Sequence, residues 1–86
     1  MAFEELVKDC VRAAFDDAEF ANFGLVKPLG KVGGVVMSHR FEGMDQVERQ
    51  TALWQALRDR FGGDELRNIS LIMTFTPDEF TDLDED

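Results

Sequence analysis

The stretch that decides the fold covers residues 35–57 and reads VVMSHRFEGMDQVERQTALWQAL. Its opening residues, VVM, are an apolar run of strand formers. Asp45 has the chemistry of a helix N-cap, and Glu48, three residues later, completes a capping box. The stretch therefore predicts a strand, a short connection and a capped helix. The apolar stripe of that helix is expected at helical spacing, on Val47, Thr51, Leu53, Trp54, Leu57 and Phe61.

The sequence before this stretch predicts a helix and a strand. An apolar stripe at helical spacing indicates an amphipathic helix over residues 2–15. We expect the helix end and a connection over residues 16–22, and a strand over residues 23–29. A turn at residues 28–31 then leads into a second strand over residues 32–39, so that the pair forms a β-hairpin. Gly33 and Gly34 fall in the second strand and are compatible with a bulge. The stripe of the first helix comprises Phe3, Leu6, Val7, Cys10, Val11 and Ala14.

The sequence after the central helix predicts one more strand between short helices. Gly62 and Gly63 end the central helix, and residues 64–66 can form a helical turn. Residues 68–76 alternate as a strand with a core face on one side. The run Thr76-Pro77-Asp78-Glu79 has the pattern of a capped helix start, and an acidic, solvated tail is expected at about residues 81–86. The expected core face of the strand is Ile69, Leu71, Met73 and Phe75.

The order of elements is thus α-β-β-α-(α)-β-(α), which defines an α+β fold in a small single domain, residues 1–86. The two hairpin strands are expected to be antiparallel. A crossover through the central helix would most easily make the second and third strands parallel. We therefore predict a three-stranded mixed sheet with helices on one face.

Composition limits the function classes. The net charge of −9 argues against a nucleic-acid backbone as the partner, because such binding depends on clustered Lys and Arg. It fits either plain solubility or attraction to a basic partner. A single Cys excludes an internal disulfide and a multi-Cys metal site. The sequence has neither a basic-then-apolar leader nor a long apolar run, so we expect a cytoplasmic protein.

Catalytic chemistry is not indicated. The one His and one Cys are expected on different elements, and the carboxylates are scattered, so we predict that the protein is not an enzyme. The run Gly30-Lys31-Val32-Gly33 matches the GxxG loop of KH domains, although it falls in the predicted hairpin and not between two helices. A KH-like nucleic-acid-binding regulator is therefore kept as the alternative function.

The central stretch also resembles the signature of the BolA-like family, a strand ending in Ser, then Phe-x-Gly, then a helix opening with an Arg-His-Arg run. The resemblance covers about residues 35–80 and implies the family's α+β fold, related to the type II KH fold. It also supplies the adjacency of the strands. The residues that match are Ser38, Phe41, Gly43, Arg49, Ala56 and Leu57, followed by Thr76, Pro77 and Glu79.

This resemblance implies a protein partner and a shared cofactor, but this chain lacks the residues that bind the cofactor in the family. BolA-like proteins commonly bind monothiol glutaredoxins and share a [2Fe-2S] cluster with them. The family's ligands are a His just before the last strand and a His or Cys in the hairpin loop. Alignment on Thr76-Pro77 places Asn68 at the first of these positions, and residues 27–34 contain neither His nor Cys. We therefore expect a divergent member with no metal site and no cofactor.

The resulting hypothesis is a non-enzymatic interaction or regulatory protein. It would dock a protein partner, with a monothiol glutaredoxin as the candidate, through the central helix and last strand. Arg49 coincides with the first Arg of the family's helix, whereas Gln50-Thr51 replaces the following His-Arg. An ion-paired, solvated helix face remains the other interpretation of the Arg residues. The expected partner-binding residues are His39, Arg40, Arg49 and Asn68.

Overall fold

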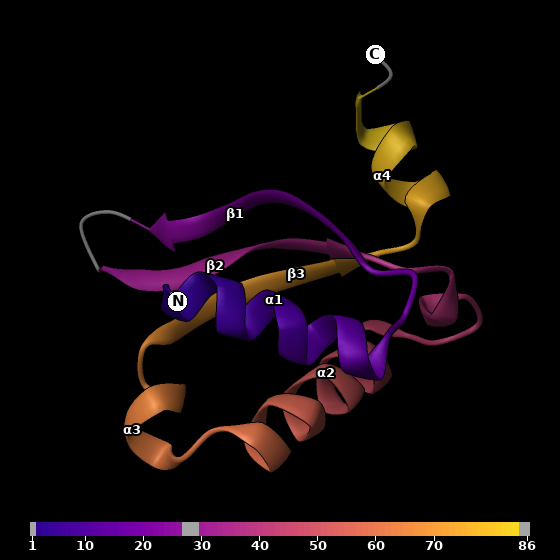
Figure 1. Ribbon diagram of the computed structural model, residues 1–86. Helices are drawn as coiled ribbons and strands as arrows, with labels where there is room; N and C mark the ends of the chain where they lie inside the picture. Colours follow the sequence, from indigo (N-terminus) through magenta and orange to yellow (C-terminus); the bar gives the residue numbers. More distant parts are fainter. Residues whose placement is uncertain (1, 27–29, 85–86) are drawn as a thin grey trace.

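The computed structural model describes residues 2–26 and 30–84. They form a three-stranded sheet with α1 and α2 against one face (Figure 1). The elements are α1 (Phe3–Ala14), β1 (Glu19–Val26), β2 (Lys31–Met37), the 3₁₀ helix η1 (His39–Phe41), α2 (Gln46–Arg60), α3 (Gly63–Leu66), β3 (Ile69–Phe75) and α4 (Pro77–Asp84). Buried side chains of α1, α2, β2 and β3 share one core, which includes Val11, Val36, Leu53, Leu57 and Ile72.

The sheet has the topology that the sequence predicts. Strand β2 lies at the centre, antiparallel to β1 and parallel to β3. The chain crosses from β2 to β3 through α2, and this crossover accounts for the parallel pair. α4 extends from the end of β3, away from α1 and α2 (Figure 1). The mixed sheet and the α+β class are therefore confirmed.

Both predicted capping boxes are present. The Glu48 amide donates to Asp45 Oδ1 at 2.8 Å, and the Asp45 amide donates to Glu48 Oε1 at 3.0 Å. In the same way, the Glu79 amide donates to Thr76 Oγ1 at 3.2 Å, and the Thr76 amide donates to Glu79 Oε1 at 2.8 Å. These reciprocal bonds satisfy amides that a helix start leaves free, and they fix where α2 and α4 begin.

The predicted apolar stripe of α2 is only partly correct. Leu53 and Leu57 are buried and Phe61 follows them into the core, but Val47 is 75% exposed. Thr51 is exposed as well. The first turns of α2 instead direct polar groups, above all the buried Arg49, toward the end of β3. The prediction failed because it assumed that the inward face of the helix was apolar along its whole length.

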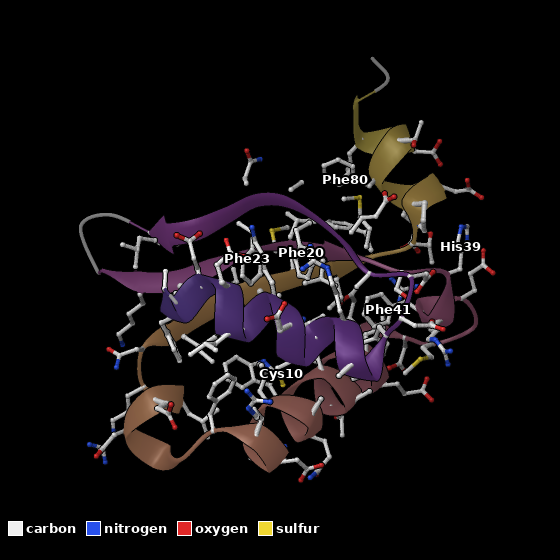
Figure 2. The ribbon with its side chains drawn as sticks, in the orientation of Figure 1. Cys10, Phe20, Phe23, His39, Phe41 and Phe80 are labelled. Atoms are coloured by element: carbon white, nitrogen blue, oxygen red, sulfur yellow. The ribbon has the colours of Figure 1, made fainter. Side chains whose placement is uncertain are left out.

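Strand β1 begins earlier than predicted, at Glu19, inside the expected connection over residues 16–22. Phe20 and Phe23 both pack toward α1, with ring centroids 5.0 Å apart and Lys8 Nζ 5.8 Å from the Phe20 ring (Figure 2). A spacing of three breaks strand alternation, because Asn22 and Phe23 together face the single residue Gly34. Residues 27–29 of the predicted strand and turn lie outside the described residues.

Strand β2 also ends earlier than predicted. It stops at Met37, and His39 begins η1 instead of ending the strand. The two glycines do mark irregular pairing, but the extra residues lie on the neighbouring strands. Gly33 stands alone against Ser70 and Leu71 of β3, just as Gly34 does against β1.

The bulge in β3 reverses its predicted core face. Beyond Ile69, the buried side chains are Ile72 and Thr74, whereas Leu71 is 71% and Met73 45% exposed. One inserted residue moves every later side chain to the opposite face of a strand. The expectation that Leu71 and Met73 belong to the core is therefore wrong.

The sequence predicted only where the C-terminal helix begins, and the structure shows how far it extends. α4 continues to Asp84, so the acidic tail expected at residues 81–86 is helical as far as that residue, and residues 85–86 lie outside the described part. The first helix keeps its predicted place, although Ala14 is exposed. None of the helices in the described ranges is long and apolar enough to cross a membrane.

Candidate functional site

The end of β2 carries a polar corner, which we define as Asp16, Asp17, Ser38, His39 and Arg40. Ser38 Oγ donates to Asp17 Oδ1 at 2.5 Å, and the His39 amide donates to Asp17 Oδ2 at 2.8 Å. Arg40 Nε donates to Asp16 Oδ1 at 3.0 Å. The carboxylates of Asp16 and Asp17, between α1 and β1, thus hold η1 in place. The side chains of His39 and Arg40 remain exposed to solvent.

The electrostatics of this corner follow from these bonds. The Ser38 hydroxyl, and after it the His39 amide, lower the pKa of Asp17. The Arg40 guanidinium lowers the pKa of Asp16. His39 Nδ1 lies 3.6 Å from Glu42 Oε1, and the His39 side chain is 64% exposed. Figure 2 shows His39 directed away from the core. Both His39 and Arg40 are therefore available to a partner.

Arg49 has a different environment. Its side chain is 6% exposed and its Nε donates to Met44 O at 2.9 Å. Its Nη1 and Nη2 donate to the two carboxylate oxygens of Glu79 at 2.6 and 3.1 Å. The guanidinium carbon lies 5.8 Å from the centre of the Phe41 ring. Arg49 thus joins α2 to α4 from inside the fold, and it offers almost no surface to a partner.

Asn68 lies at the opposite end of the sheet. Its carbonyl accepts the Val32 amide at 2.8 Å, and its Nδ2 donates to Asp64 O at 3.2 Å. Because β2 and β3 are parallel, this places Asn68 beside the start of β2 and the hairpin, as the family resemblance implies. Strand β2 spans about 20 Å at the usual rise per residue, so Asn68 is far from the polar corner. The structure does not bring the four predicted site residues together.

The groups around Asn68 do not fit an iron–sulfur cluster. Such a cluster requires thiolate or imidazole donors. The position before β3 has the side-chain amide of Asn68, and residues 27–34 contain no His or Cys in the sequence. His39 lies at the far end of β2. Within residues 2–26 and 30–84, no group of three or more His, Cys, Asp or Glu is placed to hold a metal ion.

Cys10 is inside the interface between α1 and α2. It is 7% exposed, and its Sγ donates to Ala56 O at 3.4 Å (Figure 2). Burial raises the pKa of the thiol, which disfavours the thiolate that nucleophilic or metal chemistry requires. The side chain therefore acts as a small core residue, which is the role that its place on the apolar stripe indicates.

The Gly30-Lys31-Val32-Gly33 run lies at the hairpin, as predicted, and not between helices. Gly30 has a φ of 69°, and Lys31 already begins β2. The backbone amide of Val32 is bonded to Asn68 O. In a KH domain the GxxG amides must be free to approach a nucleic-acid backbone. This geometry gives no support to the KH-like alternative.

Sequence reasoning missed a shallow groove on the sheet face opposite α1 and α2. Its volume is about 440 Å³. Two exposed apolar side chains of its wall, Leu71 and Met73, had been assigned to the core. The only signal in the sequence was the Gly33-Gly34 pair, which marks where the pairing becomes irregular. The lining residues are Asn22, Val26, Gly34, Val35, Ser70, Leu71 and Met73.

Comparison with known proteins agrees with this architecture. A solved structure of a bolA protein homologue from Coxiella burnetii matches with a TM-score of 0.69, over 94% of this chain and 99% of the other. The two sequences are 21% identical, so the match shows the fold. No family model and no curated protein matches the sequence. The chain has the BolA-like fold that its central stretch predicts.

Proposed function

We propose that this chain is a non-enzymatic interaction protein of BolA-like type, which docks a protein partner without supplying ligands to a metal cluster. The partner that we propose is a monothiol glutaredoxin, because the family resemblance implies it. The observation that carries the proposal is the position of Asn68. Its backbone carbonyl accepts the Val32 amide at the hairpin end of the sheet. At this position the family resemblance implies an imidazole ligand, whereas Asn68 has a side-chain amide, which is a poor ligand for a cluster.

The absence of catalysis is proposed from the surroundings of the two candidate nucleophilic or basic groups. A thiolate or hydroxyl nucleophile needs a base within hydrogen-bond reach. The Cys10 thiol is instead directed to Ala56 O, and burial raises its pKa. The exposed His39 has Glu42 as its neighbour, and the nearby Ser38 hydroxyl is already bonded to Asp17.

The contact residues that we propose are His39 and Arg40 at one end of the sheet and Asn68 at the other. An interface of about 800 Å² per partner is wide enough to cover both ends of a strand of this length. Arg49 contributes indirectly, because its ion pair holds α4 in place. Three of the four predicted residues would thus contact the partner directly, and Arg49 would support the fold beside them.

Calorimetric titration of the protein with an apo monothiol glutaredoxin tests the proposal. We expect saturable binding that the double substitution His39→Ala and Arg40→Ala weakens about tenfold, as the loss of two exposed contacts near an interface allows. Arg12→Ala is the matched control, because it removes a half-exposed basic side chain from α1, outside the proposed contacts. A titration without binding heat, confirmed by separate elution in gel filtration, would rule out this partner.

A further inference from the structure

The uncovered sheet face has a concave, apolar centre. Gly33 and Gly34 contribute no side chains to β2, and each lies opposite a bulge of a neighbouring strand, Gly33 opposite that of β3 and Gly34 opposite that of β1. Val26 on one wall is 37% exposed, and Leu71 and Met73 on the other are 71% and 45% exposed. Such a cluster of exposed apolar side chains on a small domain is typical of an interaction surface.

The β3 edge of the sheet, beside Leu71 and Met73 of the groove, is closed to strand addition. Gln50 Nε2 donates to Ile72 O at 2.8 Å, and Gln46 Nε2 donates to Thr74 O at 3.1 Å. These α2 side chains occupy carbonyls of β3 that an added strand would need. On this side of the sheet an occupant therefore lies on the face, where a single amphipathic helix can pack.

The charge around the groove selects the chemistry of that helix. Phe80 of α4 packs on Phe75 with ring centroids 6.0 Å apart, and Phe75 shares a face with Met73 by strand alternation. α4 therefore borders the Met73 end of the groove. Its sequence, PDEFTDLD, contains acidic residues and no Lys or Arg. The groove itself is lined by uncharged residues. A second copy of the chain would bring two net charges of −9 together, which opposes self-association.

We infer that this face binds one cationic amphipathic helix of a partner protein. The helix presents two or three apolar side chains at i, i+3 and i+4 spacing to Val35, Leu71 and Met73. Lys or Arg residues at its flank pair with the carboxylates of α4. The inference deepens the proposed function by assigning a docking surface, and it does not require the partner to be a glutaredoxin.

The test uses a short, capped Leu/Lys peptide with Leu at helical i, i+3, i+4 and i+7 positions, titrated into the ¹⁵N-labelled protein. We expect the amide resonances of Val35, Leu71 and Met73 to shift. Leu71→Ser should weaken binding about tenfold, because most of the Leu71 side chain is free to be buried by the peptide. Val47→Ser removes an equally exposed apolar group from α2 and should leave the affinity unchanged.

Two further experiments test the contribution of charge to this binding. The double substitution Asp78→Asn and Asp82→Asn should weaken binding and reduce its dependence on salt. A peptide with the same apolar positions and Glu in place of Lys should not bind. Circular dichroism of each variant confirms that the fold is intact.

Three results would overturn the inference. The first is unchanged affinity of Leu71→Ser, and the second is a set of shifts confined to α1 and α2. The third is sedimentation of the protein alone as a dimer that Leu71→Ser dissociates, since a second copy would then be the occupant. The peptide experiment contains no glutaredoxin, so its failure leaves the proposed partner to its own titration.

Discussion

The guanidinium of Arg49 and the carboxylate of Glu79 form a two-pronged ion pair, with Nη1–Oε1 at 2.6 Å and Nη2–Oε2 at 3.1 Å. The Arg49 side chain is 6% exposed and that of Glu79 is 46% exposed, so the pair reaches from the core to the surface. Glu79 also accepts the Thr76 amide, which closes the capping box of α4. One carboxylate thus both starts α4 and anchors it to α2.

Glu79→Gln should destabilise the fold because it leaves a buried guanidinium without its counter-charge. The expected loss in the free energy of unfolding is about 1–2 kcal/mol, below the value for a fully buried pair because Glu79 is half exposed. Urea denaturation followed by Trp54 fluorescence measures this loss.

Asp9→Asn is the control for that measurement. It removes the Asp9–Arg12 pair, in which the atoms are 3.6 Å apart and both side chains are about half exposed. Exposed pairs of this kind contribute little, so the expected change is below about 0.5 kcal/mol. Equal losses in the two variants would show that the burial of Arg49 is unimportant.

The same pair predicts how stability depends on pH. The Arg49 side chain, followed by the Thr76 amide, lowers the pKa of Glu79 from 4.5 to about 2. A carboxyl with a lowered pKa in the folded state stabilises the fold fully above its unfolded pKa and loses that contribution as the pH falls through the folded value. The stability difference between the wild type and Glu79→Gln should therefore shrink as the pH falls from about 4.5 to about 2. A difference that stays constant over this range contradicts the assignment.

Gly34→Ala should be strongly destabilising. Gly34 has a φ of +147°, and an added Cβ would lie 2.6 Å from Phe23 Cα and 2.7 Å from Asn22 O. Since these are backbone atoms within the bulge, they cannot move aside cheaply. We expect a loss of more than about 2 kcal/mol in thermal or urea unfolding. Gly63→Ala, at a helical position with no atom within 4 Å of the added Cβ, should be neutral or slightly stabilising.

The sequence predicted those parts of the fold that depend on local chemistry and connection length. Asp45 and Glu48 indicated the start of α2, and Thr76 with Glu79 that of α4, because a capping box needs only residues three apart. The crossover through α2 indicated a parallel pair for the same kind of reason, since a hairpin cannot join parallel strands.

The errors within the sheet lie where it departs from regular pairing. Phe20 and Phe23 do not alternate as strand residues normally do, so the start that the sequence predicts for β1 is too late. Leu71 and Met73 were assigned to the core because the alternation was read through a bulge. A bulge depends on which residues face each other across strands, and the order of residues along one strand does not contain that information. The open groove, which depends on both bulges, could not be predicted for this reason.

The structure shows where the four predicted site residues lie, and their binding of a partner stays a prediction. His39 and Arg40 follow the predicted second strand, and they are exposed at the polar corner. Arg49 coincides with the first Arg of the family's helix, but it is buried, and its guanidinium pairs with Glu79, thirty residues later in the chain. Asn68 was placed beside the hairpin by the resemblance, and the parallel register of β2 and β3 puts it there.

The most direct test of the central claim is the visible circular dichroism of a [2Fe-2S]-loaded monothiol glutaredoxin during titration with this protein. The account predicts binding in a parallel calorimetric titration, while the cluster bands keep the shape they have in the glutaredoxin alone. Asn68→His restores an imidazole donor at the hairpin end and should alter those bands. A new cluster spectrum with the wild-type protein would contradict the account, because it would show that the chain supplies a ligand after all.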